Sequence, residues 1–258
     1  MKPPAETPFR YRRGDGTALR GVFLPGAGDL IVFLSGFRSV HTGEKARAFA
    51  EFARQGGHAC LRFDYLGHGI SEGDFVHFRV SEAVHDTAAC IAQVRAPGQR
   101  LFITGSSMGG WIALEAARRR APLPDGLLLI APALDFVSRR ERELPPEMQS
   151  QLARHGHVDV ADAYVPGTHY RVTREFLDDA LRLEPGNAPL EVPCPVAIVH
   201  GTGDDSVPVT TSRALATRLP RATLMEIPGG DHRLTDHVPD LLCRLSEVMG
   251  LAEAARSR

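Results

Sequence analysis

The pentapeptide Gly105-Ser106-Ser107-Met108-Gly109 constrains the fold of this chain more than any other feature. It follows a short apolar run at 101–104 and precedes a helix-like segment at 111–120. A serine at the centre of Gly-x-Ser-x-Gly, between a strand and a helix, sits on a sharp, strained turn that exposes its hydroxyl. Side chains at the glycine positions would collide with the neighbouring strand or helix. The pattern therefore predicts a nucleophile, Ser107, that needs an acid and then a histidine later in the chain.

Strands and helices alternate along the rest of the sequence. Residues 9–13 and 19–24 flank a Gly-Asp-Gly turn and predict an N-terminal antiparallel hairpin. The apolar runs predict further strands at 30–34, 58–63, 101–104, 126–130, 196–199 and 222–227. Helices are predicted at 43–55, 81–95 (capped by Ser81), 211–219 and 238–249. This order predicts an α/β fold with a mostly parallel central sheet covered by helices, and ligand binding at the carboxyl ends of the strands.

One segment interrupts this alternation. Between Pro132 and Pro193 no strand is predicted, and the segment carries prolines, a charged run at 139–143 and helix-like stretches at 147–154 and 173–183. A long structureless loop is the alternative, but such loops are uncommon in compact domains. We therefore predict a small helical lid at 133–192, inserted into an α/β core made of residues 1–132 and 193–258.

Composition narrows the partners and the compartment. With 258 residues the chain is long enough for one large domain, and its 43% hydrophobic and 24% charged residues are ordinary for a soluble protein. A net charge of −1 gives no electrostatic reason to expect nucleic acid or an anionic membrane. No apolar run has the length of a membrane span, and the N-terminus lacks the pattern of a secretory signal. We expect a cytoplasmic protein without integral membrane association, either a monomer or a homodimer.

The four cysteines, Cys60, Cys90, Cys194 and Cys243, lie far apart and show no Cys-x-x-Cys spacing. Buried, reduced thiols are expected, rather than a disulfide or a metal site.

A late strand leads into the predicted acid. Residues 196–199 run into His200-Gly201-Thr202-Gly203-Asp204-Asp205-Ser206-Val207-Pro208, which resembles the His-Gly-x-x-Asp-x-x-Val-Pro acid loop of α/β-hydrolases. The resemblance assigns the acid to Asp204, with Asp205 as its exposed neighbour. Asp135, just after the preceding strand, is the alternative acid. The carboxylate must accept a hydrogen bond from imidazole and fix its tautomer.

The base is expected in the loop after the last strand. His232 ends the glycine-rich stretch Pro228-Gly229-Gly230-Asp231-His232 and precedes the C-terminal helix, where the family places its histidine. The other histidines lack this combination of order, preceding strand and glycines. His200 is expected to pack or to form hydrogen bonds beside the acid loop.

Two backbone amides are expected to form the oxyanion hole. One is that of Met108, at the start of the helix after the nucleophile, and the other is that of Phe37, in the loop after the strand at 30–34. Many family members have His-Gly where this chain has Ser35-Gly36. The loop Asp64-Tyr65-Leu66-Gly67-His68-Gly69-Ile70-Ser71 also resembles a family motif and is expected to be a structural turn, because its glycine spacing is not that of a dinucleotide site.

Four separated motifs in the right order, spread over residues 19–249, make the chain similar to the esterase and lipase branch of the α/β-hydrolase superfamily. Segments 33–39, 62–65 and 105–111 look similar to a small-lid group of acyl-protein thioesterases that includes the mycophenolic acid acyl-glucuronide esterase type. The resemblance implies a serine hydrolase that cleaves ester or thioester bonds of small or acyl-chain substrates without metal or organic cofactor. Three alternatives stay open: a non-catalytic binding protein of the same fold, a cofactor-free perhydrolase or haloperoxidase, and a peptidase. The peptidase is less favoured, because amides need better protonation of the leaving group and the lid is short.

Overall fold

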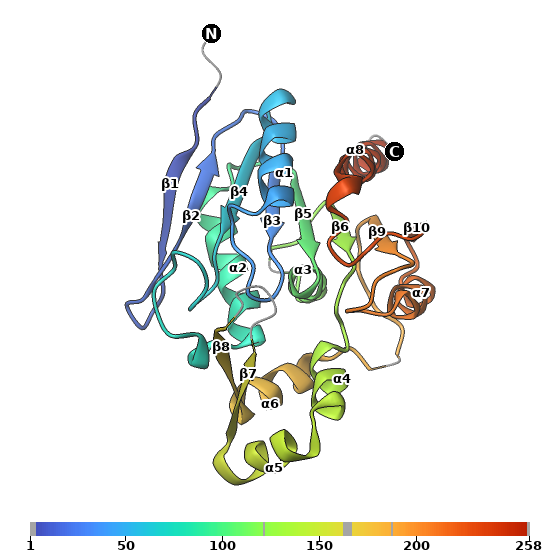
Figure 1. Cartoon of the computed structure of the whole chain (residues 1–258). Helices are drawn as coiled ribbons and strands as arrows, with labels where there is room; N and C mark the ends of the chain where they lie inside the picture. The colour runs from blue at the N-terminus through green and yellow to red at the C-terminus, as the bar shows by residue number, and fades with distance from the viewer. Residues whose placement is uncertain (1–3, 121, 162–166, 187, 257–258) are drawn as a thin grey trace.

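A computed structural model describes residues 4–120, 122–161, 167–186 and 188–256. Eight strands form one sheet in the order β1-β2-β4-β3-β5-β6-β9-β10 (Figure 1). Their bounds are β1 (Thr7–Arg12), β2 (Ala18–Leu24), β3 (Leu30–Leu34), β4 (Ala59–Phe63), β5 (Leu101–Ser106), β6 (Gly126–Ile130), β9 (Val196–Gly201) and β10 (Ala222–Ile227). The strands from β4 to β10 are parallel, and β1 and β2 pair antiparallel, as the sequence predicts.

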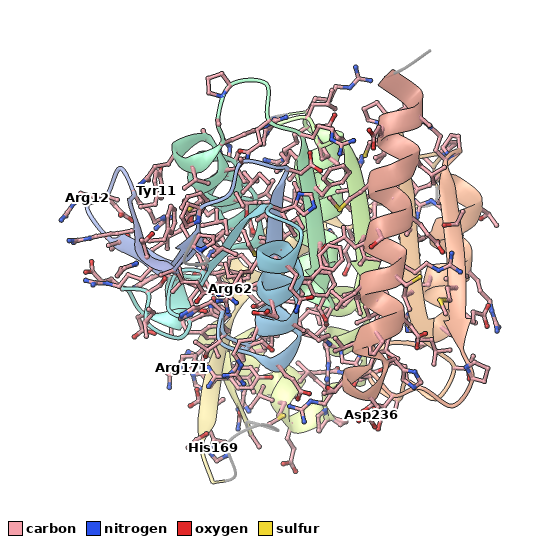
Figure 2. The ribbon with its side chains drawn as sticks, turned by 90° about the horizontal axis from the view of Figure 1, so that it is seen from above. Tyr11, Arg12, Arg62, His169, Arg171 and Asp236 are labelled. Carbon is pink, nitrogen blue, oxygen red and sulfur yellow. The ribbon has the colours of Figure 1, made fainter. Side chains whose placement is uncertain are left out.

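Helices cover both faces of the sheet. They are α1 (Glu44–Gln55), α2 (Val80–Val94), α3 (Met108–Arg118), α7 (Val209–Arg218) and α8 (Val238–Arg256), with single turns η1 (Phe75–His77) and η2 (Thr235–His237). Alternate residues of β3 point to opposite faces. Ile31 and Phe33 pack with the helices α1 and α8, which Figure 2 shows on the same side, whereas Val32 packs with α2, α3 and α7. Both faces of the central strands are therefore buried, which explains their continuous apolar sequences.

The segment between β6 and β9, which we call the insert (residues 133–192), lies below the carboxyl ends of the strands in Figure 1. It contains α4 (Phe136–Glu143), α5 (Pro146–His155), β7 (His157–Ala161), β8 (His169–Thr173) and α6 (Arg174–Leu183). The prediction that it holds no strand is wrong, because β7 and β8 pair as an antiparallel two-stranded sheet. Both are five residues long with several charged or histidine side chains, so their apolar residues do not form a run. The charged run at 139–143 is part of α4.

The start of α2 differs from the prediction. The helix begins at Val80 after Arg79, so Ser81 is not its cap. The backbone N–H and the hydroxyl of Ser81 instead donate to the carboxylate of Asp179 in α6, at 3.0 and 2.5 Å. These bonds join the insert to the core.

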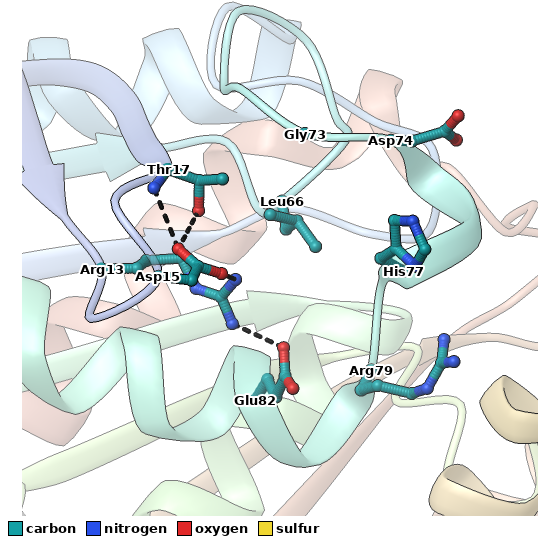
Figure 3. A pocket seen from close by; sticks show the side chains of 9 residues that line it. All are labelled: Arg13, Asp15, Thr17, Leu66, Gly73, Asp74, His77, Arg79 and Glu82. Atoms are coloured by element: carbon teal, nitrogen blue, oxygen red, sulfur yellow. Dashed lines mark hydrogen bonds and ion pairs between the residues drawn. The ribbon is translucent and has the colours of Figure 1, made fainter.

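The four cysteines are free, and Cys60, Cys90 and Cys194 are buried as expected. The expectation of burial is wrong for Cys243, which is exposed on α8. Among the helices of the described residues, none has both the length and the apolar character needed to span a bilayer. A polar cavity of about 300 Å³ lies between the β1–β2 turn and the start of α2 (Figure 3). Arg13, which lines this cavity, forms ion pairs with Asp15 at 2.8 Å and with Glu82 at 2.5 Å.

Candidate active site

Ser107 lies on a strained turn between β5 and α3. Its φ of 56° and ψ of −120° place a non-glycine residue in a conformation that L-amino acids rarely adopt. A Cβ on Gly105 would lie 2.1 Å from the carbonyl oxygen of Gly109, and one on Gly109 would lie 2.1 Å from that of Leu34. The two glycines are therefore required by backbone contacts. The turn is held by the Ser107 N–H, which donates to the carbonyl of Ile130 at 2.8 Å.

The structure brings the predicted acid and base to this serine. His232 Nε2 lies 3.1 Å from Ser107 Oγ, and His232 Nδ1 lies 2.7 Å from Asp204 Oδ2. The three residues follow β5, β9 and β10, which are parallel and end at the same edge of the sheet. The acid and base loops also pack closely, since a Cβ on Gly201 would lie 2.1 Å from the carbonyl oxygen of Gly230.

The carboxylate of Asp204 is fully buried and uses both oxygens. Oδ1 accepts the backbone N–H groups of Ser206 and Val207, each at 2.8 Å. Oδ2 faces His232 and lies 3.1 Å from His200 Nε2. Burial alone would raise the pKa of Asp204, but the hydrogen bonds from the two histidines and from Val207 outweigh it and hold the pKa well below its usual range. The group is therefore ionised at neutral pH.

His200 and Asp205 lie beside Asp204 as the sequence predicts, and His200 also approaches the carboxylate itself. His200 is buried, with Nδ1 2.6 Å from Ser212 Oγ and Nε2 2.9 Å from the carbonyl of Val207. Its approach to the acid itself was not foreseen, although its position four residues before Asp204 is the signal. Asp205 is exposed and accepts a hydrogen bond from the Ser206 hydroxyl at 3.2 Å. Asp135, the alternative acid, pairs loosely with Arg139 at 3.8 Å and has no hydrogen bond with His232.

The two amides expected to form the oxyanion hole belong to segments that meet at the serine. A Cβ on Gly36 would lie 3.3 Å from Ser107 Cβ, so the loop after β3 packs against the turn. Across the described part of the chain, no group accepts a hydrogen bond from the backbone N–H of Phe37 or of Met108. The N–H of Met108 also lies at the positive end of the α3 dipole.

The loop after β4 holds the loop that carries Phe37. Asp64 accepts the backbone N–H of His41 at 2.6 Å, pairs with His41 Nδ1 at 2.7 Å and accepts the N–H of Ile70 at 3.0 Å. The Tyr65 hydroxyl donates to the carbonyl of Ser35 at 3.3 Å. The expected structural turn thus holds the loop that carries Phe37 in place. His41 was not singled out from the sequence, since a loop histidine carries no signal without its partner.

Lys45, near the start of α1, also lies beside the site. Its ammonium donates to the carbonyl of Arg233, next to His232. Burial lowers the pKa of Lys45 to about 8, and the charge of Asp231 only partly opposes this shift. The sequence offers one hint, because lysine occurs only here and at position 2.

An apolar cavity of about 210 Å³ lies between the insert and the core. The ring of Phe37 lines it and packs against three rings of the insert, those of Phe136, Tyr170 and Phe176, with centroids 5.1, 5.5 and 6.0 Å away. Among the residues that the structure describes, no group of three or more His, Cys, Asp or Glu side chains is placed to hold a metal ion.

Comparison with known proteins agrees with this geometry. Residues 27–158 match the Hydrolase_4 family, described as serine aminopeptidase S33. The mitochondrial palmitoyl-protein thioesterase ABHD10 of rat is 32% identical over 230 residues, 88% of this chain and 77% of the relative. The human protein of the same name is 31% identical over 237 residues, with the same coverage. Because these relatives are named mitochondrial, the cytoplasmic location expected from the sequence stays a prediction.

Solved structures of α/β-hydrolases also superpose on this chain. Alpha/beta hydrolase domain-containing protein 10 from mouse superposes with a TM-score of 0.84 at 29% identity, covering 95% of this chain and 98% of its own. Est1E from Butyrivibrio proteoclasticus with bound ferulic acid gives a TM-score of 0.79 at 22% identity, covering 95% and 99%, and shares the fold. With the family match over half of its length and relatives above 30% identity, the chain belongs to the Hydrolase_4 family of α/β-hydrolases and is a serine hydrolase of that fold.

Proposed function

We propose that this enzyme cleaves carboxylic ester or thioester bonds of small or acyl-chain substrates through an acyl-enzyme on Ser107. The observation that carries the proposal is the continuous line of contacts from Ser107 Oγ to His232 Nε2 at 3.1 Å and from His232 Nδ1 to Asp204 at 2.7 Å. A nucleophile, a base and an orienting acid in this order are the minimum set for acyl transfer.

In the first half of the reaction, His232 Nε2 takes the proton of Ser107 as the serine oxygen attacks the acyl carbonyl carbon. The N–H groups of Phe37 and Met108 donate to the oxyanion of the tetrahedral intermediate, each worth about 10²–10³ in turnover. Asp204 stays ionised and stabilises the imidazolium, because its hydrogen bonds hold its pKa low. His232 then protonates the leaving alcohol or thiol.

In the second half, water replaces the leaving group. His232 takes a proton from the water, whose oxygen attacks the acyl-enzyme, and the collapse of the second tetrahedral intermediate returns the proton to Ser107. Every proton moves through His232, so the chain's own residues complete the cycle.

The insert is proposed to act as the lid over the acyl group, with residues 1–132 and 193–258 as the catalytic core. Two contacts support this role: the N–H of Ala133 donates to the carbonyl of Ser107 at 3.2 Å, and the ring of Phe37 packs against aromatic rings of the insert. The thioesterase names of the relatives support thioesters as substrates alongside oxygen esters.

The test is labelling with a fluorophosphonate probe, together with hydrolysis of p-nitrophenyl acetate and of an acetyl thioester. Labelling mapped to Ser107, and turnover lost in Ser107→Ala with an unchanged circular dichroism spectrum, would support the proposal. A folded protein with no labelling and no turnover of either substrate would refute it and favour a binding role.

A further inference from the structure

The cavity between the insert and the core is bounded on several sides by apolar side chains. All five elements of the insert, or the turns beside them, contribute to its lining. Its apolar lining includes Phe37 from the core and Val137, Met148, Val160, Val172 and Leu177 from the insert. An apolar, partly enclosed space of this kind binds hydrocarbon, because burial removes apolar surface from water.

Phe37 connects the wall of the cavity to the reacting group. The backbone N–H of Phe37 is a proposed oxyanion donor, and its ring forms part of the cavity wall. The loop of Phe37 packs against the serine, with a Cβ on Gly36 only 3.3 Å from Ser107 Cβ. A carbonyl held at Ser107 therefore has its acyl chain directed along the Phe37 ring.

Helix α5 is the element of the insert that lies farthest from the sheet in Figure 1. It contributes Met148 to the lining. Charged side chains of α4, among them Arg140 and Glu141, border the space on one side, and Glu141 is held by Arg174 at 2.7 Å. A chain that outgrows the apolar part meets charged groups and solvent, where further methylenes gain little.

The volume sets the length of chain that fits. At about 30 Å³ for a group the size of a water molecule, which is close to that of a methylene, the cavity of about 210 Å³ holds about seven carbons. The palmitoyl chain in the relatives' name has about fifteen carbons beyond its carbonyl, roughly twice this capacity.

We infer that this cavity is a medium-chain acyl site, selecting esters or thioesters with acyl groups of about eight carbons and discriminating against palmitoyl. The inference rests on the proposed function and narrows its substrate class. Burial of one methylene favours binding about fourfold. Hence kcat/KM rises by up to about fourfold for each methylene up to octanoyl and then levels off or falls.

The experiment measures kcat/KM of the full chain for p-nitrophenyl esters from acetyl to palmitoyl, and for the matching N-acetylcysteamine thioesters, below their micelle concentrations. Met148→Trp fills part of the cavity and should move the optimum to butanoyl or hexanoyl. Met148→Ala should move it to longer chains. Ser150→Trp, at an exposed position of the same helix, is the matched control and should keep the wild-type profile.

An optimum at palmitoyl, a flat profile, or equal shifts in Met148→Trp and Ser150→Trp would overturn the inference while leaving Ser107-dependent hydrolysis intact. Absence of Ser107-dependent turnover for every chain length would instead refute the proposed function. Thermal unfolding of each variant shows whether it is folded, and Met148→Ala keeps the test decisive if the tryptophan variant is not.

Discussion

Replacing Asp204 by Asn tests the acid through a change of a single atom. Asp204 presents one oxygen to two backbone N–H groups, of Ser206 and Val207, and the other to the nitrogens of His200 and His232. An asparagine has one oxygen and one NH₂, so it satisfies only one of these two sides. The two orientations of the amide have different consequences.

If the amide oxygen stays on the backbone side, its NH₂ faces His232 Nδ1. That nitrogen must then accept, which moves the imidazole proton to Nε2, the atom 3.1 Å from Ser107 Oγ. A histidine in this tautomer cannot take the serine proton, and the expected loss in kcat is about 10⁴. If the amide is reversed, its NH₂ faces the backbone N–H groups of Ser206 and Val207, and leaving a buried donor without a partner costs about 1–3 kcal/mol each. The first orientation therefore prevails.

The assay compares kcat of wild type, Asp204→Asn and Asp205→Asn on p-nitrophenyl acetate, with urea unfolding of each from pH 7 to pH 3. Asp205 is exposed, so its substitution should change stability by no more than about 0.5 kcal/mol and leave kcat near that of wild type. The pKa of Asp204 is lower in the folded than in the unfolded state, so its stabilisation is full above the unfolded value and is lost as pH falls through the folded one. The stability difference between wild type and Asp204→Asn should thus begin to shrink as pH falls below about 4, the usual pKa of an unfolded Asp. Retention of a tenth of wild-type kcat by Asp204→Asn, or a greater loss in Asp205→Asn, would refute the assignment.

Three other substitutions test the site and its surroundings. Ser107→Ala should lower kcat by about 10⁶ and abolish fluorophosphonate labelling, and residual turnover near wild type would show another nucleophile. Gly109→Ala should destabilise the fold by about 3 kcal/mol or more in urea, because the added Cβ would lie 2.1 Å from the carbonyl oxygen of Leu34. The control is Gly250→Ala in α8, where nothing lies within 4 Å; it should be neutral or stabilising, and equal losses would refute the steric argument. Lys45 has a folded pKa of about 8 against its usual 10.5, so the unfolded state binds more protons between these values and stability should rise with pH there. Lys45→Met should reduce that rise in urea unfolding from pH 7 to pH 10, and an unchanged slope would rule out Lys45 as its source.

The core could be predicted from the sequence because backbone geometry dictates its residue types. Gly105 and Gly109 have no room for a Cβ, and Ser107 occupies a positive φ that the turn imposes. The central strands are buried on both faces, so β3, β5 and β6 read as apolar runs. Parallel order then places the ends of β9 and β10 beside the serine. The resemblance of the loops at these ends to α/β-hydrolase motifs is what assigned Asp204 and His232 from the sequence.

The strands of the insert could not be predicted from the same patterns. In β7 and β8 the cross-strand pair Asp159–Arg171, with a 2.8 Å ion pair, stands on the exposed side, while Val158 is buried on the other. A five-residue strand with one buried face gives too few positions to establish a period of two. Its pairing depends on packing against α5 and α6, and this information lies in the tertiary structure.

Contacts between distant segments could not be predicted from the sequence either, because they too depend on the tertiary structure. The pairing of His41 with Asp64 needs the loops after β3 and β4 to lie side by side, which follows from the sheet order rather than from either motif. The cavity proposed for the acyl chain is still harder to predict from the sequence, because its volume depends on Phe37 and on side chains from every element of the insert. Relatives can share the fold and the triad positions yet differ in this volume, because one methylene is enough to change a packed wall. The preferred length of the acyl chain should therefore vary within the family through substitutions at positions such as Met148, while Ser107 and its partners keep their positions.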